Sequence, residues 1–174
     1  MNWDAVGAIA EIDVKRLKLI PVASHHAQDM YPLLTEPALY HFTGGRPPSN
    51  MKSVQRWFSD LETRESPDGS QQWLTWIVHL KLEKAHIGYV QATITEAEAD
   101  IAWLIGTNWQ GQGYAKEAVA MLVSCLREQR IKRLTAHIHP NHKASQWVAT
   151  SAGFFCTDAY DEGEQVWAVS LDRE

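Results

Sequence analysis

A run of small residues between an apolar segment and an amphipathic one is the part of this sequence best suited to chemistry. Residues 101–105 are apolar, and residues 110–115 read Gln-Gly-Gln-Gly-Tyr-Ala. The glycines at 111 and 113 allow a backbone to approach a ligand without a Cβ in the way. Where such a turn opens a helix, several backbone N–H groups point outward at the positive end of the helix dipole. The pattern therefore predicts an anion site suited to a pyrophosphate.

Two common nucleotide-binding motifs do not fit this turn. The dinucleotide fingerprint needs G-x-G-x-x-G near the first strand, but here the third glycine is missing and the turn lies late in the chain. The NTPase phosphate loop needs Gly-Lys-Ser/Thr, whereas Tyr114 follows Gly113. The alternative to an anion site is a tight strand-to-helix turn that uses glycine for its geometry alone.

Three histidines further along invite a metal interpretation. His137 and His139 are alternate residues of an expected strand and would share one face, with His142 close behind. A zinc site needs a fourth ligand, and none is evident. Cys125 and Cys156 match no metal or redox spacing. We therefore expect no metal.

The hydrophobic pattern predicts the elements that position these residues. Strands are expected over residues 16–22, 73–82, 87–95, 100–105, 134–139, 154–157 and 165–171. Helices are expected within residues 26–41, 50–61, 114–129 and 141–152, with Asn141 as the cap of the last one. The strands between 73 and 105 should form an antiparallel meander, and the strand–helix–strand unit from 100 to 139 should form a parallel pair. The predicted class is α/β, with a mixed, mostly antiparallel sheet and helices on both faces.

Composition limits the setting of this fold. The 174 residues are 45% hydrophobic and 21% charged, which favours one soluble domain over residues 1–174, with 1–12 as an N-terminal extension. The net charge of −5 and the lack of a basic stripe argue against nucleic-acid binding. No signal peptide and no apolar run of ~20 residues is visible, so we expect a cytoplasmic protein that does not bind membranes.

Tryptophan is the one residue type in excess, with eight copies. We expect Trp57, Trp147 and one of Trp73 and Trp76 in the core, because they fall on apolar faces of the expected elements. Trp3 has no predicted place.

Two segments together resemble the GNAT acetyltransferase superfamily. Its acyl-CoA motif is Gln/Arg-x-x-Gly-x-Gly/Ala, which residues 110–115 match at every fixed position. Downstream, residues 139–145 (His-Pro-Asn-His-Lys-Ala-Ser) and 153–154 (Gly-Phe) resemble its second CoA-contacting segment, Pro-x-Asn-x-x-Ser … Gly-Phe. The serine is typical of the branch of ribosomal-protein N-terminal acetyltransferases. The resemblance implies the GNAT fold, in which the parallel pair splays apart.

The chain departs from the family pattern at two positions. The family asparagine three residues before the serine is His142 here, and Asn141 is displaced by one. An imidazole can donate a hydrogen bond in its place. Many relatives also carry a tyrosine that protonates the leaving thiolate, and the matching residue here is Ala149.

The resemblance implies acetyl-CoA as cosubstrate and indicates its contacts. The pantetheine arm would lie along the splayed strand, on Trp103, Leu104 and Ile105. The pyrophosphate would bind the turn, formed by Gln110, Gly111, Gln112, Gly113, Tyr114 and Ala115. The second segment would add Asn141, His142 and Ser145.

Acetyl transfer to an amine also needs a proton acceptor and a proton donor. An ammonium of pKa near ~10 must lose a proton, and a thiolate of pKa near ~8.5 must be protonated or stabilised. Ser145 is the expected donor, with local helix capping as its alternative role. Glu98 and Asp100 flank the thioester strand and are candidate bases, unless they only form a solvated turn. His139 is the other candidate base, because histidine titrates near neutrality.

The acceptor is expected to be a primary amine of a small molecule or of a peptide or protein N-terminus. One wall of its pocket would come from residues 40–46, with His41 and Arg46, and the other from the hairpin near Trp167. Trp103 would lie at the thioester end. The acidic residues between 158 and 164 favour a cationic amine.

Two other functions remain open, and so does the oligomeric state. Ala149 and His142 also suit a catalytically weak acyl-CoA sensor, and the same fold can use a longer donor such as succinyl-CoA. We expect a monomer or a homodimer.

Overall fold

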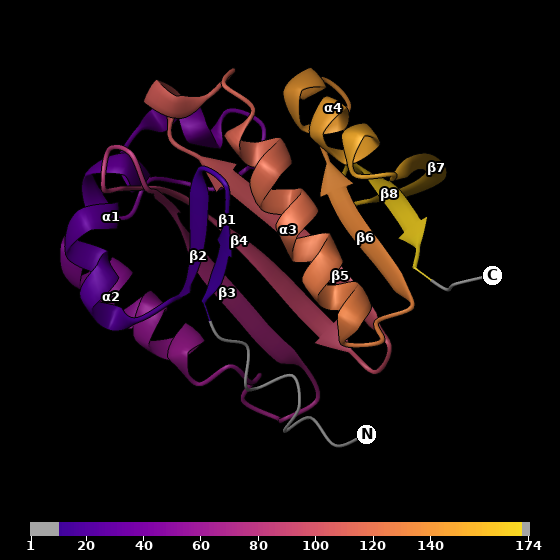
Figure 1. Cartoon of the computed structure of the whole chain (residues 1–174), viewed down its shortest axis with the longest axis horizontal. Coiled ribbons are helices and arrows are strands. Elements are labelled where there is room, and N and C mark those ends of the chain that lie inside the picture. The colour runs from indigo at the N-terminus through magenta and orange to yellow at the C-terminus, as the bar shows by residue number, and fades with distance from the viewer. Residues whose placement is uncertain (1–10, 172–174) are drawn as a thin grey trace.

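One eight-stranded sheet with helices on both faces forms the computed structural model, which describes residues 11–171 (Figure 1). The strands lie in the order β1-β2-β3-β4-β5-β6-β8-β7, and β5–β6 is the parallel pair among them. Their bounds are β1 Ile12–Val14, β2 Leu17–Pro21, β3 Gln72–Leu80, β4 Ala85–Thr95, β5 Glu98–Ile105, β6 Arg133–Ile138, β7 Phe155–Asp161 and β8 Glu164–Ser170. The predicted α/β class and mixed topology are confirmed.

Two layers of helices bury the two faces of this sheet. The helices are α1 Ala27–Leu34, α2 Met51–Glu62, α3 Tyr114–Glu128 and α4 Lys143–Ser151, with short 3₁₀ helices η2 Ser24–His26, η3 Pro37–Tyr40 and η4 Thr107–Trp109. The apolar face of α3 packs into the main core, while α1 and α2 cover the other face with a second, smaller core (Figure 1). None of the helices within residues 11–171 is long and apolar enough to cross a membrane.

Strand β5 has a long ladder on one side and a short one on the other. It pairs with β4 from Thr95↔Glu98 to Gly88↔Ile105. Its parallel ladder with β6 covers only Glu98↔Arg133 to Asp100↔Thr135. Beyond Asp100 the two strands separate, so the splay implied by the family resemblance is present.

The long ladder depends on a glycine. A Cβ on Gly88 would lie 2.0 Å from the carbonyl oxygen of Leu104 and 3.0 Å from the Cα of Ile105. Any side chain at this position would push β4 and β5 apart. Gly88 therefore allows β4 to hold the end of β5, which carries the predicted cosubstrate contacts at residues 103–105.

Some predicted boundaries need correction. Strand β1 begins at Ile12, inside the segment expected to be an extension, because it forms a hairpin with β2. The cap of α4 is His142 and not Asn141: the His142 side chain accepts a hydrogen bond from the backbone N–H of Ser145.

The tryptophan predictions are partly wrong. Trp76 is buried, but Trp57 is 36% and Trp147 57% exposed. The buried residues of α4 are Val148 and Ala149, so Trp147 points outward, where the Nζ of Lys116 lies 5.1 Å from its ring centroid. Trp3 lies outside the described residues.

Candidate active site

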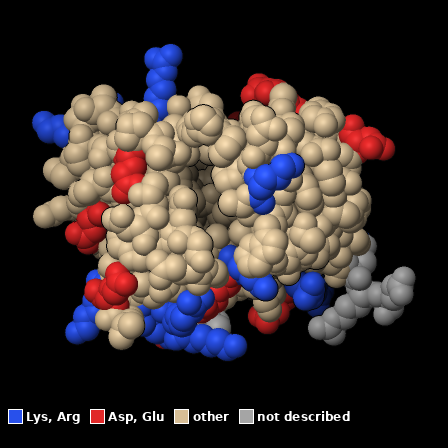
Figure 2. Space-filling model, turned by 90° about the horizontal axis from the view of Figure 1, so that it is seen from above, with Lys and Arg blue, Asp and Glu red and all other residues tan. Residues whose placement is uncertain are grey.

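The carboxyl ends of β5 and β6 border an opening at one end of the molecule. Residues 101–105 pair with β4 on one edge, and on the other edge they have no strand partner among residues 11–171. The view in Figure 2, onto the end where α4 and the start of α3 lie in Figure 1, shows a hollow between two halves of the surface. Unpaired backbone groups beside a hollow need partners, which an extended ligand arm can supply.

Side chains of this strand alternate between the two cores. Trp103 packs against the main core beside Ile105, on the face covered by α3, whereas Leu104 packs against the smaller core. The three predicted pantetheine contacts are therefore at the opening, but Trp103 and Leu104 point to opposite faces.

The glycine-rich turn has the geometry that the sequence predicts. Gly111 and Gly113 have φ of +72° and +82°, and Gly113 is the N-cap of α3 with no side-chain cap bond. The first N–H groups of the helix therefore have no intrahelical acceptor and lie at its positive end. The Nε2 of Gln110 donates to the carbonyl oxygen of Ile105 at 2.8 Å, which ties the turn to the end of β5. The turn can hold an anion.

Arg16 is a cation beside this turn that the sequence prediction missed. It lies between β1 and β2, yet its Nη1 donates to the carbonyl oxygen of Gln112 at 3.2 Å. Its Nε donates to Glu117 at 2.8 Å, and its guanidinium lies 4.4 Å from the ring centroid of Tyr114. No local pattern signals a contact across about 100 residues of sequence.

Ser145 lies against the imidazole of His142. The Nδ1 of His142 accepts from the backbone N–H of Ser145 at 3.2 Å, and its Nε2 lies 3.4 Å from the Oγ of the same serine. Burial lowers the pKa of His142, so the ring is neutral at neutral pH. Because Nδ1 is an acceptor, the single ring proton sits on Nε2 and points at Oγ. The Ser145 hydroxyl is thereby left to donate its own proton elsewhere.

The loop after η3, which belongs to the predicted acceptor wall of residues 40–46, reaches this histidine. The ring of Phe42 lies 4.5 Å from that of His142, 5.4 Å from that of His139 and 4.6 Å from that of His41. His41 and Arg46 are themselves exposed, so Phe42 is the contact residue.

Of the two candidate carboxylates, Asp100 lies nearer the opening. It is the last residue of the parallel ladder, its Oδ1 accepts from the Oγ1 of Thr135 at 3.0 Å, and burial raises its pKa. The Glu98 side chain lies two residues earlier, at the start of the strand, where it is 61% exposed against 47% for Asp100 and its carboxylate lies 3.8 Å from Arg133. The predicted role of Glu98 as a base is not supported by this placement.

The imidazole of His137 lies between two carboxylates. Its Nε2 lies 3.5 Å from the Oδ1 of Asp100, and its Nδ1 lies 3.4 Å from the Oδ2 of Asp161. Glu164 is nearby on β8, and burial raises its pKa. Sequence reasoning considered His137 only as a metal ligand. Within residues 11–171 no group of three or more His, Cys, Asp or Glu side chains is placed to hold a metal ion.

The other base candidate and one pocket candidate lie differently from their predictions. The Nδ1 of His139 accepts from the N–H of Asn141 at 3.1 Å, so this ring braces the turn before α4. Trp167 is only 9% exposed and belongs to the main core, opposite Ala136 on the neighbouring strand. It does not line an open cleft.

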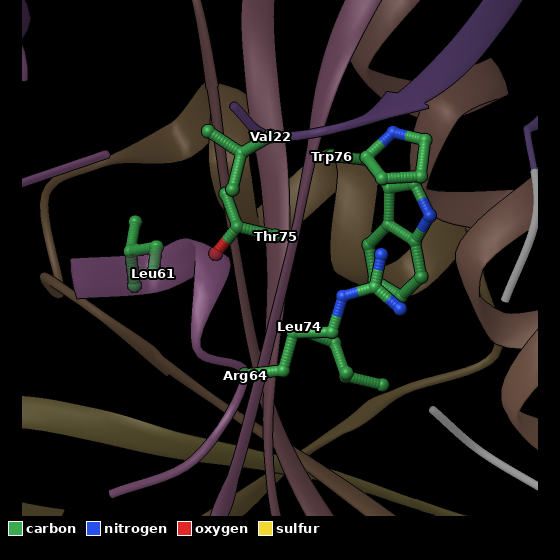
Figure 3. Close-up of a pocket in the computed structure, with 7 residues that line it drawn as sticks. Val22, Leu61, Arg64, Leu74, Thr75 and Trp76 are labelled. Carbon is green, nitrogen blue, oxygen red and sulfur yellow. The ribbon is translucent and has the colours of Figure 1, made fainter. Parts of the chain in front are cut away.

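A separate pocket has no part in this site. It has an empty volume of about 250 Å³ and is lined by Leu61, Val22, Arg64 and residues of β2 and β3 (Figure 3). None of its lining residues comes from β5, β6 or the turn before α3.

Comparison with known proteins gives one family and many similar folds. The family model for the acetyltransferase (GNAT) domain matches residues 16–155. No curated protein matches the sequence significantly.

Three solved structures illustrate the likeness of fold. RimL, a ribosomal L7/L12 alpha-N-protein acetyltransferase in complex with coenzyme A, is 17% identical, with a TM-score of 0.78 over 92% of this chain and 97% of its own. An aminoglycoside acetyltransferase in complex with coenzyme A is 18% identical, with a TM-score of 0.71 over 88% and 94%. An acetyltransferase from Bacillus anthracis is 15% identical, with a TM-score of 0.74 over 92% and 98%.

Proposed function

This chain belongs to the GNAT acetyltransferases, and we propose that it transfers an acetyl group from acetyl-CoA to a primary amine by direct attack in a ternary complex. The observation that carries the proposal is the open edge of β5, which lies between an uncapped helix N-terminus and a carboxylate. One ligand can occupy the open edge and the turn together, while a second approaches Asp100.

The residues present suit acetyl-CoA. The N–H groups of the turn 110–115 and the guanidinium of Arg16 would hold the pyrophosphate, because both present donors or positive charge to an anion. The pantetheine arm would bond the backbone of residues 103–105. A Cβ at Gly111 would meet no atom within 4 Å, so the outer side of the turn is open to a ligand.

Ser145 is proposed to protonate the leaving sulfur. The amine nitrogen forms a bond to the thioester carbon, the C–S bond breaks, and the thiolate takes the hydroxyl proton of Ser145. His142 supports this role because its Nε2–H faces the serine oxygen and leaves the hydroxyl hydrogen free. A buried Ala149 stands where many relatives place a tyrosine, so the serine acts without it.

The acceptor is proposed to be a cationic amine. Asp100, Asp161 and Glu164 face the imidazole of His137 from three strands and give this side of the opening a negative potential. The names of RimL and of the aminoglycoside acetyltransferase describe a protein N-terminus and a polycationic sugar, which are two acceptors of this class.

Calorimetry and a thiol-release assay test the proposal. We expect acetyl-CoA to bind with micromolar affinity, and thiol release to require an amine from a panel of spermidine, kanamycin and a hexapeptide with a free N-terminus. Succinyl-CoA in competition reports the preferred donor. No binding of acetyl-CoA would overturn the proposal, and binding without turnover of any amine would favour an acyl-CoA sensor.

A further inference from the structure

We infer that His137, oriented by Asp161, takes the proton from the acceptor ammonium while Asp100 holds that ammonium at the opening. The inference rests on the proposed amine acetyltransferase function and assigns its proton acceptor. It concerns a residue on β6, whereas the sequence pattern favoured carboxylates on β5 and His139.

The three side chains lie on one face of the sheet. Asp100 and Thr135 are paired across β5 and β6, and His137 is two residues further along the same strand as Thr135, so it points to the same side. This is the first residue position past the ladder at which β6 faces the opening on that side. Asp161 reaches the ring from the β7–β8 hairpin.

The two carboxylates make the ring nitrogens unequal in function. Asp161 lies 3.4 Å from Nδ1 and Asp100 lies 3.5 Å from Nε2, and an ionised carboxylate can only accept. Because the Oδ1 of Asp100 already accepts from Thr135, Asp161 has the greater need of the ring proton and favours the tautomer with that proton on Nδ1. Nε2 is then a bare acceptor that faces the Oδ1 of Asp100 at 3.5 Å. An ammonium that enters beside these two acceptors can donate to both, because it carries three N–H groups.

The choice between these two acceptors follows from their chemistry. As a residue type, an imidazole matches an ammonium proton at neutral pH better than a carboxyl, since the reference pKa of a carboxyl lies near ~3.9, from which burial raises that of Asp100. Thr135 already donates to the Oδ1 of Asp100, which suits that carboxylate to an electrostatic role. The imidazolium formed on proton transfer is stabilised by the carboxylates that flank it, Asp100 on β5 and Asp161 on β7, with Glu164 on β8 close by.

The protons balance over the reaction. An ammonium loses two N–H protons when it becomes an amide nitrogen. The first passes to the Nε2 of His137 and from there to solvent, and it leaves the lone pair that forms the bond to the thioester carbon. The second leaves the nitrogen as the C–S bond breaks and restores the Ser145 hydroxyl, whose own proton has gone to the sulfur. The net products are the amide, CoA thiol and one released proton.

Steady-state kinetics of the full chain test the assignment, with acetyl-CoA and the fastest amine of the panel. We expect His137→Gln to lower kcat/KM about a hundredfold at pH 7 and to change its pH profile, so that only the fall caused by protonation of Asp100 remains on the acidic side. Asp161→Asn should lower kcat with little change in KM, whereas Asp100→Asn should mainly raise KM for the amine. The control is His25→Gln, an exposed histidine of η2 outside the site, which should retain wild-type kinetics.

Chemical rescue separates proton transfer from a structural role. In His137→Ala, added imidazoles should restore turnover, and the rescued rate should rise with the pKa of the imidazole. Rescue that does not depend on this pKa, or a His137→Gln variant with an unchanged pH profile, would overturn the inference while leaving the acetyltransferase function standing. Absence of turnover by the wild type would overturn both.

Nitrogen-15 NMR of the free protein tests the orientation without any amine. We expect the Nδ1–H tautomer for His137, lost in Asp161→Asn, and the Nε2–H tautomer for His142. An Nε2–H tautomer on His137 would contradict the inference, because that nitrogen would then have no lone pair for the ammonium proton.

Discussion

The two edges of β5 differ in how much backbone they pair. Toward β4 the ladder runs the full length of the strand. At position 88 the two backbones lie so close together that glycine is the only residue type that fits. Toward β6 it stops after Asp100, and residues 101–105 continue along the proposed site for the cosubstrate. The same five residues thus form part of the core on one edge and part of the site on the other.

This difference shows how one strand serves stability and chemistry together. The closed edge holds the backbone of β5 in place, so the unpaired groups of the open edge are positioned before any ligand arrives. The groups proposed to act lie around the open edge, on β5, β6, α4 and the turn before α3. Changes at the closed edge should therefore affect folding first, and changes at the open edge should affect function first.

Forcing the closed edge of β5 away from β4 should have the largest effect. In Gly88→Val the new side chain meets a backbone oxygen that cannot move away cheaply, so we expect a loss of at least about 3 kcal/mol in the free energy of unfolding. Denaturant unfolding measures it. Gly69→Asn is the control, because that glycine has φ of +71° in open space, which asparagine tolerates. Equal stabilities of the two variants would contradict the close contact.

Blocking the glycine-rich turn beside the open edge should abolish cosubstrate binding and should cost less stability than Gly88→Val. Gly113→Glu puts a negative charge where the pyrophosphate is proposed to bind, and calorimetry should show no acetyl-CoA binding. Gly163→Glu repeats the substitution at another positive φ, in the β7–β8 turn, and should bind normally. Wild-type affinity in Gly113→Glu would place the pyrophosphate elsewhere.

Two carboxylates on the same face of β5 should respond differently. Asp100→Asn is expected to lower kcat/KM for the amine about a hundredfold, while Glu98→Gln changes it less than twofold. The kcat/KM of the wild type should fall as pH decreases through the raised pKa of Asp100, because protonation removes the charge that holds the ammonium. An equal loss in both variants would show that it makes no difference whether the carboxylate lies at the end of the parallel ladder or two residues earlier.

Ser145→Ala should lower kcat by about tenfold, the low end of a general acid's contribution. The matched control is Ser151→Ala, an exposed serine at the other end of α4. Full activity in Ser145→Ala would show that the hydroxyl is not a proton donor in the reaction and that its role is limited to its contact with the His142 ring.

The smallest effect concerns stability at the open edge. A carboxyl whose pKa is raised in the folded state binds its proton more tightly there than in the unfolded chain, so stability is lost as pH rises through that pKa. At pH 7 the ionised Asp100 therefore costs stability, and Asp100→Asn should melt a few degrees higher than wild type. The difference should disappear near pH 3, where both forms are neutral. A lower melting temperature for the variant at pH 7 would contradict this sign.

Local sequence patterns predict the parts of this molecule that depend on neighbouring residues. The alternation of apolar residues predicts the strands, and Gly111 and Gly113 predict the turn, because backbone conformation follows from a few adjacent side chains. Even the cap of α4 is wrong by only one residue, His142 for Asn141.

Contacts between distant segments are the parts that the sequence did not reveal. Arg16 on Glu117, Phe42 on His142 and Asp161 on His137 each join residues that lie in different elements. Their side chains are ordinary for a surface, and only the strand order brings them together. Trp147 was misplaced for a similar reason, since its helix lies at the edge of the fold and buries a narrow face.

The salt bridge between Arg16 and Glu117 also joins segments that are synthesised at different times. The turn that carries Arg16 leaves the ribosome 101 residues before its partner, so the contact can form only after the first turn of α3 has been made. A truncated product that ends within α2 already contains the arginine but has neither the turn nor the acid. Conversely, a fragment that begins at β3 has a complete glycine-rich turn without its guanidinium. The proposed anion site thus draws on two segments that lie far apart in the translation product, and neither segment alone contains both the turn and the guanidinium.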